Sequence, residues 1–272
     1  MSWRGSRSSQ GCCWSACAQS GARSSLQFVK SLRASESQLL LVNSSMLRDS
    51  APAAVPPLPS WALAYDMEAE SQYRKDSWYY NLEVAAAANA SGEPLDFVIF
   101  GDSMTARIRL NNPESWADHF GDLQGAPMGV GGNTVQELMW RLGVGGERFA
   151  VSPRVVVIWI GYNDLIQGSD PVPYLDFLLR WARAAWPGSH LLLLNVLPNT
   201  SFSPVVVAAV NAQYGALAAR WGASFSTCGC RIDPTDTSLL KDGHHPAEAG
   251  YQRIFRCLRH QYDALVAADA VA

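Results

Sequence analysis

The chain has 272 residues, 48% of them hydrophobic, which suits one α/β domain with an appendage. Its formal charge is −3, and because the first 35 residues carry five basic and no acidic residues, the remainder carries −8. An acidic body without a basic cluster argues against nucleic-acid binding. No apolar run approaches the roughly 20 residues that cross a bilayer, so we expect no transmembrane segment and a soluble body.

Residues 1–60 are predicted to form a disordered leader and a proline-rich linker. Ten of the first 35 residues are serines, and this arginine-rich, acid-poor composition is typical of a chloroplast or mitochondrial transit peptide. A disordered N-terminus on a cytoplasmic protein is the equally weighted alternative, so the cellular location stays open. Four prolines within residues 49–60 favour extended geometry and indicate the linker.

Cysteine usage does not predict a disulfide framework. Three of the six cysteines lie in the leader, and Cys228, Cys230 and Cys257 are spread over the body. An odd number in the body is poor evidence for pairing.

Residues 61–94 are predicted to be a lead-in helical segment, with a helix over 61–88 that covers one edge of the domain. The main domain is predicted to occupy residues 95–272. Within it, residues 97–100, 155–160 and 191–196 are short, continuous apolar runs. Such runs are typical of strands buried on both faces of a parallel sheet.

Helical patterns alternate with these strands. Apolar residues recur at helical spacing from Tyr174 to Ala185, before Pro187 and Gly188 end the segment. Further helices are predicted over residues 205–221 and from Pro246, in the first turn, to about residue 265. This alternation predicts an open, doubly wound α/β sheet whose ligands bind beyond the C-terminal ends of the strands.

Asp242 and His245 lie three residues apart in one short stretch near the C-terminus. In a tight loop, an aspartate at this spacing can reach Nδ1 of the imidazole and leave Nε2 to face a nucleophile. The spacing favours His245 over its neighbour His244. Asp242 and His245 are therefore predicted to be two members of a serine triad.

Ser103 is the candidate nucleophile, because it follows the strand at 97–100 in the segment Gly101-Asp102-Ser103. Its hydroxyl would emerge at the edge of the sheet where doubly wound folds place their sites. A serine hydroxyl is unreactive at neutral pH unless an imidazole takes its proton. Taken alone, Gly-Asp-Ser is an ordinary turn or helix cap.

Two further segments could supply donors to an oxyanion. Gly132 lies in a glycine-rich stretch before a helical pattern, where its backbone N–H could face the oxyanion. Asn163 follows the strand at 155–160, and its side-chain amide could donate another hydrogen bond. The alternatives are a flexible turn capped by Asn133 and a helix capped by Asn163 and Asp164.

A metal site is the alternative interpretation of the histidine-rich loop. Asp242, His244 and His245, with Cys228 or Cys230, contain ligand atoms, but their spacing matches no standard zinc pattern, so we expect no metal. The three remaining histidines are predicted to be surface or packing residues; they are His119, His190 and His260.

In chain order, these segments resemble the four sequence blocks of the SGNH, or GDSL-like, hydrolases. The blocks are Gly101-Asp102-Ser103, Gly132, Gly161-x-Asn163-Asp164 and Asp242-x-x-His245-Pro246. Within that family, the chain looks closest to the intracellular platelet-activating factor acetylhydrolase catalytic subunits. The stretches that carry this likeness are Gly129 to Thr134 with Trp140-Arg141-Leu142, Val156 to Gly161, and Leu194 to Pro198.

The resemblance implies a three-layer α/β/α, flavodoxin-like fold with a central parallel sheet and a serine esterase mechanism without a cofactor. Ser103 would be the nucleophile, His245 the base and then the acid, and Asp242 the residue that orients it. The N–H groups of Ser103 and Gly132 and the amide of Asn163 would form the oxyanion hole.

The substrate implied by the resemblance is a carboxylic ester with a small acyl group, a lipid or an acetylated sugar. The blocks at 161–164 and 242–246 have the general family form, so acetyl-specific pocket residues cannot be carried over. An acyltransferase that uses the same triad and a binding module without turnover are the alternatives. The oligomeric state cannot be read from the sequence.

Overall fold

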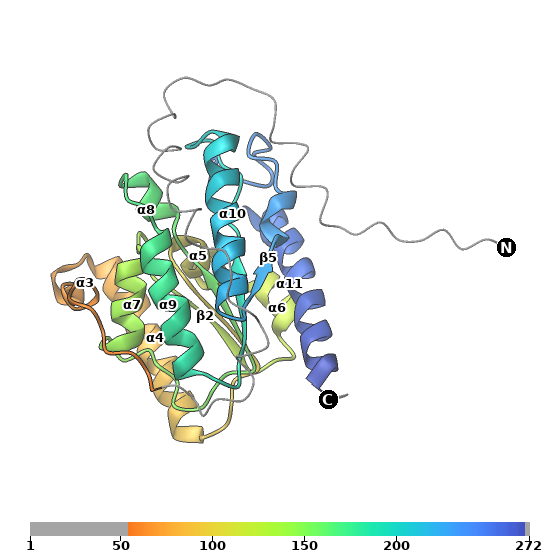
Figure 1. The fold of residues 1–272 in the computed structure, drawn as a ribbon. Coiled ribbons are helices and arrows are strands. Elements are labelled where there is room, and N and C mark those ends of the chain that lie inside the picture. Colours follow the sequence, from red (N-terminus) through yellow and green to blue (C-terminus); the bar gives the residue numbers. More distant parts are fainter. Residues whose placement is uncertain (1–53, 270–272) are drawn as a thin grey trace.

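A parallel sheet of five strands lies at the centre of the computed structural model, which describes residues 54–269 (Figure 1). All the pairings are parallel, and the order across the sheet is β2-β1-β3-β4-β5. The strands are β1 (Phe97–Gly101), β2 (Gly125–Gly129), β3 (Val155–Trp159), β4 (His190–Leu194) and β5 (Ser224–Ser226). The predicted parallel α/β sheet is therefore confirmed.

Helices cover both faces of the sheet and complete the three layers (Figure 1). One apolar cluster joins Val98 and Phe100 of β1 to helices on one face, and a second joins Phe97 and Ile99 to helices on the other. Successive strand residues point to opposite faces, so a strand covered on both sides must be apolar throughout. The first face carries α3 (Ser60–Leu63), α4 (Gln72–Ser91), α7 (Val135–Gly143), α9 (Val172–Ala185) and α10 (Pro204–Arg220), and the second carries α5 (Ser103–Asn111), α6 (Pro113–Phe120) and α11 (Glu248–Asp269).

The strand order reverses between β1 and β3, and this position places the site. Gly101 at the end of β1 is level with Gly129 of β2 and Trp159 of β3. The chain leaves β1 through α5 on one face, whereas α9 after β3 packs on the other. Doubly wound folds bind ligands in the crevice beyond such a reversal.

The lead-in segment differs from the single helix predicted over 61–88. It consists of α3, the short helix η4 (Met67–Ala69), which the Asp66 side chain caps, and α4. Before α3, Val55 and Leu58 pack against the core. The domain boundaries at residues 60 and 94 stay a prediction.

Three other expectations need correction. The sequence did not predict β2, because Gly-Ala-Pro-Met-Gly is not a continuous apolar run, nor the three-residue β5. Pro246 lies before α11 and forms a bridge with Leu240.

Cys228 and Cys257 form a disulfide, contrary to the expectation from the odd cysteine count. They are 29 residues apart in sequence, and the short helix η5 (Cys228–Arg231) packs against α11. Counting cysteines could not reveal this pair, because tertiary packing brings the two sulfurs together.

Of the leader and linker predicted over residues 1–60, residues 1–53 lie outside the described residues. Between residues 54 and 269, no helix is long and apolar enough to cross a membrane. The cellular location stays a prediction.

Candidate active site

Ser103 is the first residue of α5, immediately beyond the end of β1. Asp102 caps this helix, because its Oδ1 accepts a hydrogen bond of 2.9 Å from the N–H of Met104. The bend is tight: a Cβ on Gly101 would collide with the Thr105 side chain and the Trp159 carbonyl. A glycine at 101 therefore lets α5 start against the sheet, with the Ser103 hydroxyl at the strand ends.

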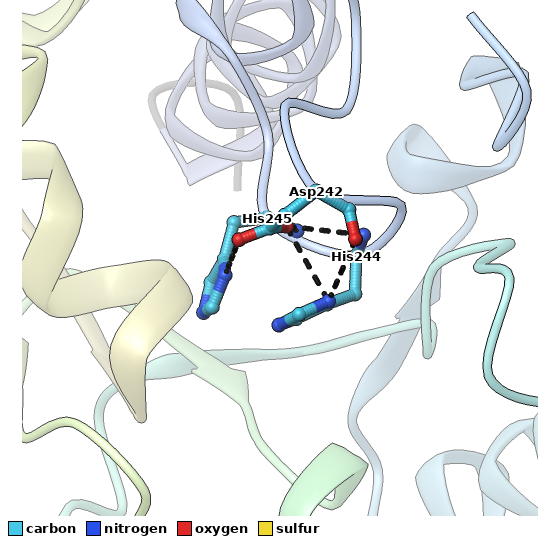
Figure 2. A group of neighbouring side chains, drawn as sticks. All are labelled: Asp242, His244 and His245. Carbon is cyan, nitrogen blue, oxygen red and sulfur yellow. Dashed lines mark hydrogen bonds and ion pairs between the residues drawn. The ribbon is translucent and has the colours of Figure 1, made fainter. Parts of the chain in front are cut away.

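His245 lies against Ser103, although 142 residues separate them in sequence. Its Nε2 is 2.8 Å from the Ser103 Oγ, and its Nδ1 is 2.7 Å from the Asp242 Oδ2. Figure 2 shows the loop that presents Asp242, His244 and His245, with the Asp242 carboxylate folded back toward both imidazoles. The His245 backbone N–H also donates to Asp242, at 2.8 Å.

The surroundings of this pair favour a neutral imidazole beside a charged carboxylate. Burial lowers the pKa of His245, the hydrogen bond to Asp242 raises it, and electrostatic interactions with His244 and Arg107 lower it again, with a net fall below its usual value. Desolvation raises the pKa of Asp242, but the hydrogen bonds from His245 outweigh it and hold the pKa well below its usual range. A neutral imidazole can take the proton of Ser103.

Residues 130–134, between β2 and α7, form a loop that lies beside Ser103 and is called the glycine loop below. Gly132 has φ +76°, a backbone conformation that glycine adopts without strain. Within residues 54–269, no hydrogen bond uses the backbone N–H of Gly132 or of Ser103. The next helix, α7, is capped by Thr134 in a reciprocal pair with Glu137, rather than by Asn133. Both N–H groups are available to a ligand.

Asn163 lies in α8 (Tyr162–Ile166), which follows β3 and is capped by Gly161. Its Nδ2 donates to the Asp102 Oδ2 at 3.1 Å and to the Asn133 carbonyl at 2.9 Å. These two bonds fix the amide between the Asp102 side chain and the Asn133 backbone and use both of its hydrogens. Asn163 can therefore donate to an oxyanion only if one of these two hydrogens is shared between its present acceptor and the oxyanion.

A fully buried arginine, which the sequence analysis did not single out, ties these loops together. Arg141 of α7 donates to the Gly101 carbonyl at 2.9 Å and to the Asn133 Oδ1 at 3.0 Å. Its charge is balanced by Glu147, also fully buried, at 2.7 Å. One guanidinium thus joins the end of β1 to the glycine loop. The family likeness included Trp140-Arg141-Leu142, but it gave Arg141 no role, and an arginine on a helix is usually exposed.

These groups open onto a cavity of about 450 Å³. Its wall consists of Ser71, Tyr73, Arg74, Ser103, Arg107, Gly131, Gly132, Tyr162, Asn163, His244 and His245. The sequence analysis did not identify the contributions of Ser71, Tyr73 and Arg74 near the start of α4, which no motif marks. Arg107 could have been found, because it lies four residues after Ser103 on one helix face.

The metal interpretation loses its cysteine ligands. The ligand atoms of Asp242, His244 and His245 lie within 4.8 Å of one another, but Cys228 is in the disulfide. The Nε2 of His245 faces Ser103 and its Nδ1 faces Asp242, so both ring nitrogens are engaged. The His244 ring stacks on Tyr162, with ring centroids 5.2 Å apart.

The other three histidines lie elsewhere in the fold. His119 packs against Phe120 and Phe255, His190 pairs with Asp269, and His260 is exposed. This agrees with their predicted surface and packing roles.

A parallel α/β/α sheet with a serine, a histidine and an aspartate in line at its strand ends has the form of a serine hydrolase. The chain belongs to the GDSL-like Lipase/Acylhydrolase family, whose profile matches residues 99–253. The predicted SGNH, or GDSL-like, membership is thereby confirmed.

Curated relatives carry the name platelet-activating factor acetylhydrolase IB subunit alpha2. The human protein is 26% identical over 152 residues, which cover 56% of this chain and 60% of that protein. The chicken protein is 28% identical over the same length. The chain thus matches less than two thirds of the length of these relatives.

Solved structures share the fold. A Streptococcus pneumonia structure named for platelet activating factor aligns with a TM-score of 0.59 and 17% identity, covering 70% of this chain and 93% of that one. A GDSL-like lipase from Bacteroides thetaiotaomicron aligns with a TM-score of 0.51 and 20% identity, covering 68% and 98%.

Proposed function

We propose that the protein is a serine esterase that hydrolyses a carboxylic ester through an acyl-Ser103 intermediate. The observation that carries the proposal is the line of hydrogen bonds from the Ser103 Oγ through the His245 imidazole to Asp242, at 2.8 Å and 2.7 Å. Membership of the acylhydrolase family supports it.

In the acylation step, the Ser103 Oγ attacks the ester carbonyl carbon while its proton passes to the His245 Nε2. Asp242 holds Nδ1 and stabilises the imidazolium that forms. The carbonyl oxygen becomes an oxyanion and accepts hydrogen bonds from the N–H groups of Ser103 and Gly132, with Asn163 as a third donor. The tetrahedral intermediate then expels the alcohol, which takes the proton from His245.

Deacylation repeats these steps with water. His245 takes a proton from the water molecule as its oxygen attacks the acyl carbon, and the same donors receive the oxyanion. The bond to the Ser103 Oγ breaks, and His245 returns the proton to the serine. The products are a carboxylic acid and the free enzyme.

The test is activity toward a panel of short 4-nitrophenyl esters, together with labelling by a fluorophosphonate probe. Wild-type protein is expected to hydrolyse members of the panel and to be labelled at Ser103. Ser103→Ala is expected to lose labelling and to lower kcat by about a millionfold, as for the triad serine of a comparable hydrolase. Ser115→Ala, at a buried serine of α6, is the matched control and should keep both.

Unchanged activity in Ser103→Ala would refute the assignment of the nucleophile. Wild-type protein that is neither labelled nor active would favour the binding module. Product analysis with an added alcohol or sugar separates hydrolysis from acyl transfer, since a transferase would form a new ester.

A further inference from the structure

The wall of the active-site cavity contains two arginines, Arg74 and Arg107, although the chain as a whole carries a net charge of −3. Two histidines line the cavity as well, and among residues 54–269 no carboxylate does. A cavity wall with guanidinium groups and without carboxylates attracts an anionic ligand.

Arg107 is the arginine of this wall whose charge is left unbalanced. It is half-buried on α5, one turn beyond Ser103, and within residues 54–269 no hydrogen bond or ion pair uses its guanidinium. One helical turn places it about 6 Å along the axis from the nucleophile. A partly desolvated guanidinium with five unused donors gains much from a carboxylate or phosphate partner.

Other arginines near the site already have partners. Arg74 pairs with Glu70 at 2.7 Å and with Glu137 at 3.2 Å. Arg109, two residues beyond Arg107, stacks over the Tyr80 ring at 4.3 Å and does not line the cavity. The contrast shows that Arg107 is exceptional among these guanidinium groups.

Arg74, although paired with carboxylates, adds a guanidinium to the same cavity wall from a segment that precedes β1. Its Nε is buried without a hydrogen-bond partner. Its guanidinium carbon lies 3.9 Å from the position that a Cβ would take on Gly132, beside the proposed oxyanion hole. A second guanidinium, already paired with Glu70 and Glu137, therefore lies at the cavity wall, and the segment before the family match at residues 99–253 supplies it.

We propose that the ester cleaved at Ser103 carries an anionic group, a carboxylate or a phosphate, that binds to Arg107. This inference rests on the proposed esterase function and narrows its substrate class. The anion is either part of the acyl group, as in a half-ester of a dicarboxylic acid, or part of the alcohol, as in an acylated phosphoalcohol. Arg107 acts as a binding residue that selects charged esters over neutral ones.

The test uses two matched ester pairs that differ only in charge. For the acyl side, they are 4-nitrophenyl monosuccinate and its methyl-capped diester. For the alcohol side, they are 2-acetoxyethyl phosphate and its dimethyl ester. In at least one pair, wild-type protein is expected to show a kcat/KM about tenfold or more higher for the charged member, as charge-assisted hydrogen bonds allow.

The variants assign this preference to one guanidinium. Arg107→Met keeps a long apolar stem and should reduce the charged-to-neutral ratio to near one. Arg109→Met makes the same change of net charge outside the cavity and should keep the wild-type ratio. Inhibition of the wild-type protein is a further test. Inorganic phosphate should compete with the neutral ester, whereas sodium chloride at equal ionic strength should not.

The outcomes separate the two proposals. Equal rates within both pairs, with no competition by phosphate, would overturn the anionic substrate and leave the esterase standing. A charged-ester preference that survives in Arg107→Met would overturn the role of Arg107. If the wild-type protein cleaves no ester and Ser103 is not labelled, the esterase function fails, and this inference fails with it.

Discussion

Two aspartates flank the Ser103–His245 pair in opposite surroundings. Asp102 is 1% exposed, and burial raises its pKa to about 7. The Asp242 side chain is 39% exposed, and its hydrogen bonds from His245 hold its pKa well below the usual range. The difference shows that solvent exposure and hydrogen bonds determine the protonation state of these two aspartates. Closeness to Ser103 and His245 alone does not determine it.

The partners of the two carboxylates also differ in sequence distance. Asp242 bonds to His245, three residues away, so this contact is made within one short loop. Asp102 bonds to Asn163, 61 residues away, so its geometry depends on the packing of β1 against β3. One carboxylate orients the proposed base, and the other orients a proposed oxyanion donor.

Among the variants that test this comparison of the two aspartates, Asp242→Asn is expected to have the largest effect. The loss of the carboxylate removes the group that holds the His245 tautomer, so kcat on a 4-nitrophenyl ester should fall by about ten-thousandfold, as in a comparable triad. The thermal midpoint should change little, because the side chain is partly exposed. Asp233→Asn, in an exposed turn of the same segment, is the control and should keep full activity. Retention of a tenth of wild-type kcat in Asp242→Asn would contradict the orienting role.

The Cys228–Cys257 disulfide closes a loop that contains Asp242, whereas the turn at Ser103 contains no cysteine. Opening the 29-residue loop with Cys228→Ser and Cys257→Ser together should lower the free energy of unfolding by about 3–4 kcal/mol, from the chain-entropy estimate. Denaturant unfolding with and without reductant measures the change. Cys230→Ser should keep the sensitivity to reductant. Equal stability of wild-type and double-variant proteins would show that packing of η5 on α11 suffices.

Asp102→Asn tests the buried carboxylate. The asparagine offers one acceptor oxygen where the aspartate uses two, so either the Met104 N–H or the Asn163 amide loses its partner. Because asparagine also caps helices well, the fold should persist, whereas kcat should fall about ten- to hundredfold through a misoriented Asn163.

A double-variant cycle with Asn163→Ala checks the coupling. If Asp102 acts through Asn163, the two losses should be strongly non-additive. Fully additive effects would show that the buried aspartate acts through the helix cap alone.

The smallest effect is a shift of the pH profile. His245 must be neutral to act as a base, and burial lowers its pKa, so kcat/KM should rise with pH through a midpoint below 6.5. In Arg107→Met, one positive charge that lowers this pKa is removed, so the midpoint should move upward. Rate measurements from pH 4 to 8 on the neutral ester decide it; a wild-type midpoint above 7 would contradict the neutral imidazole.

The sequence was informative wherever the chemistry depends on local spacing or on long apolar runs. The runs at 97–100, 155–160 and 191–196 predicted three strands of the parallel sheet, since strands buried on both faces must be apolar throughout. The sequence did not predict β2, because its residues show no periodic pattern of apolar side chains. It also did not predict the Cys228–Cys257 disulfide, because the two sulfurs meet only when η5 packs on α11.

The candidate site divides in the same way. The spacing of Asp242 and His245 was sufficient to predict their contact, because three residues in a tight loop leave the side chains few alternatives. The four ordered sequence blocks also determined the family, which the profile match confirms.

Only the tertiary structure decided how Arg141 joins the β1 end to the glycine loop, and that both hydrogens of Asn163 are engaged. It also decided that a half-buried Arg107 faces the cavity without a carboxylate partner in the part of the chain that the structure describes. The physical reason is that burial and charge balance depend on segments distant in sequence, whose arrangement local spacing does not specify.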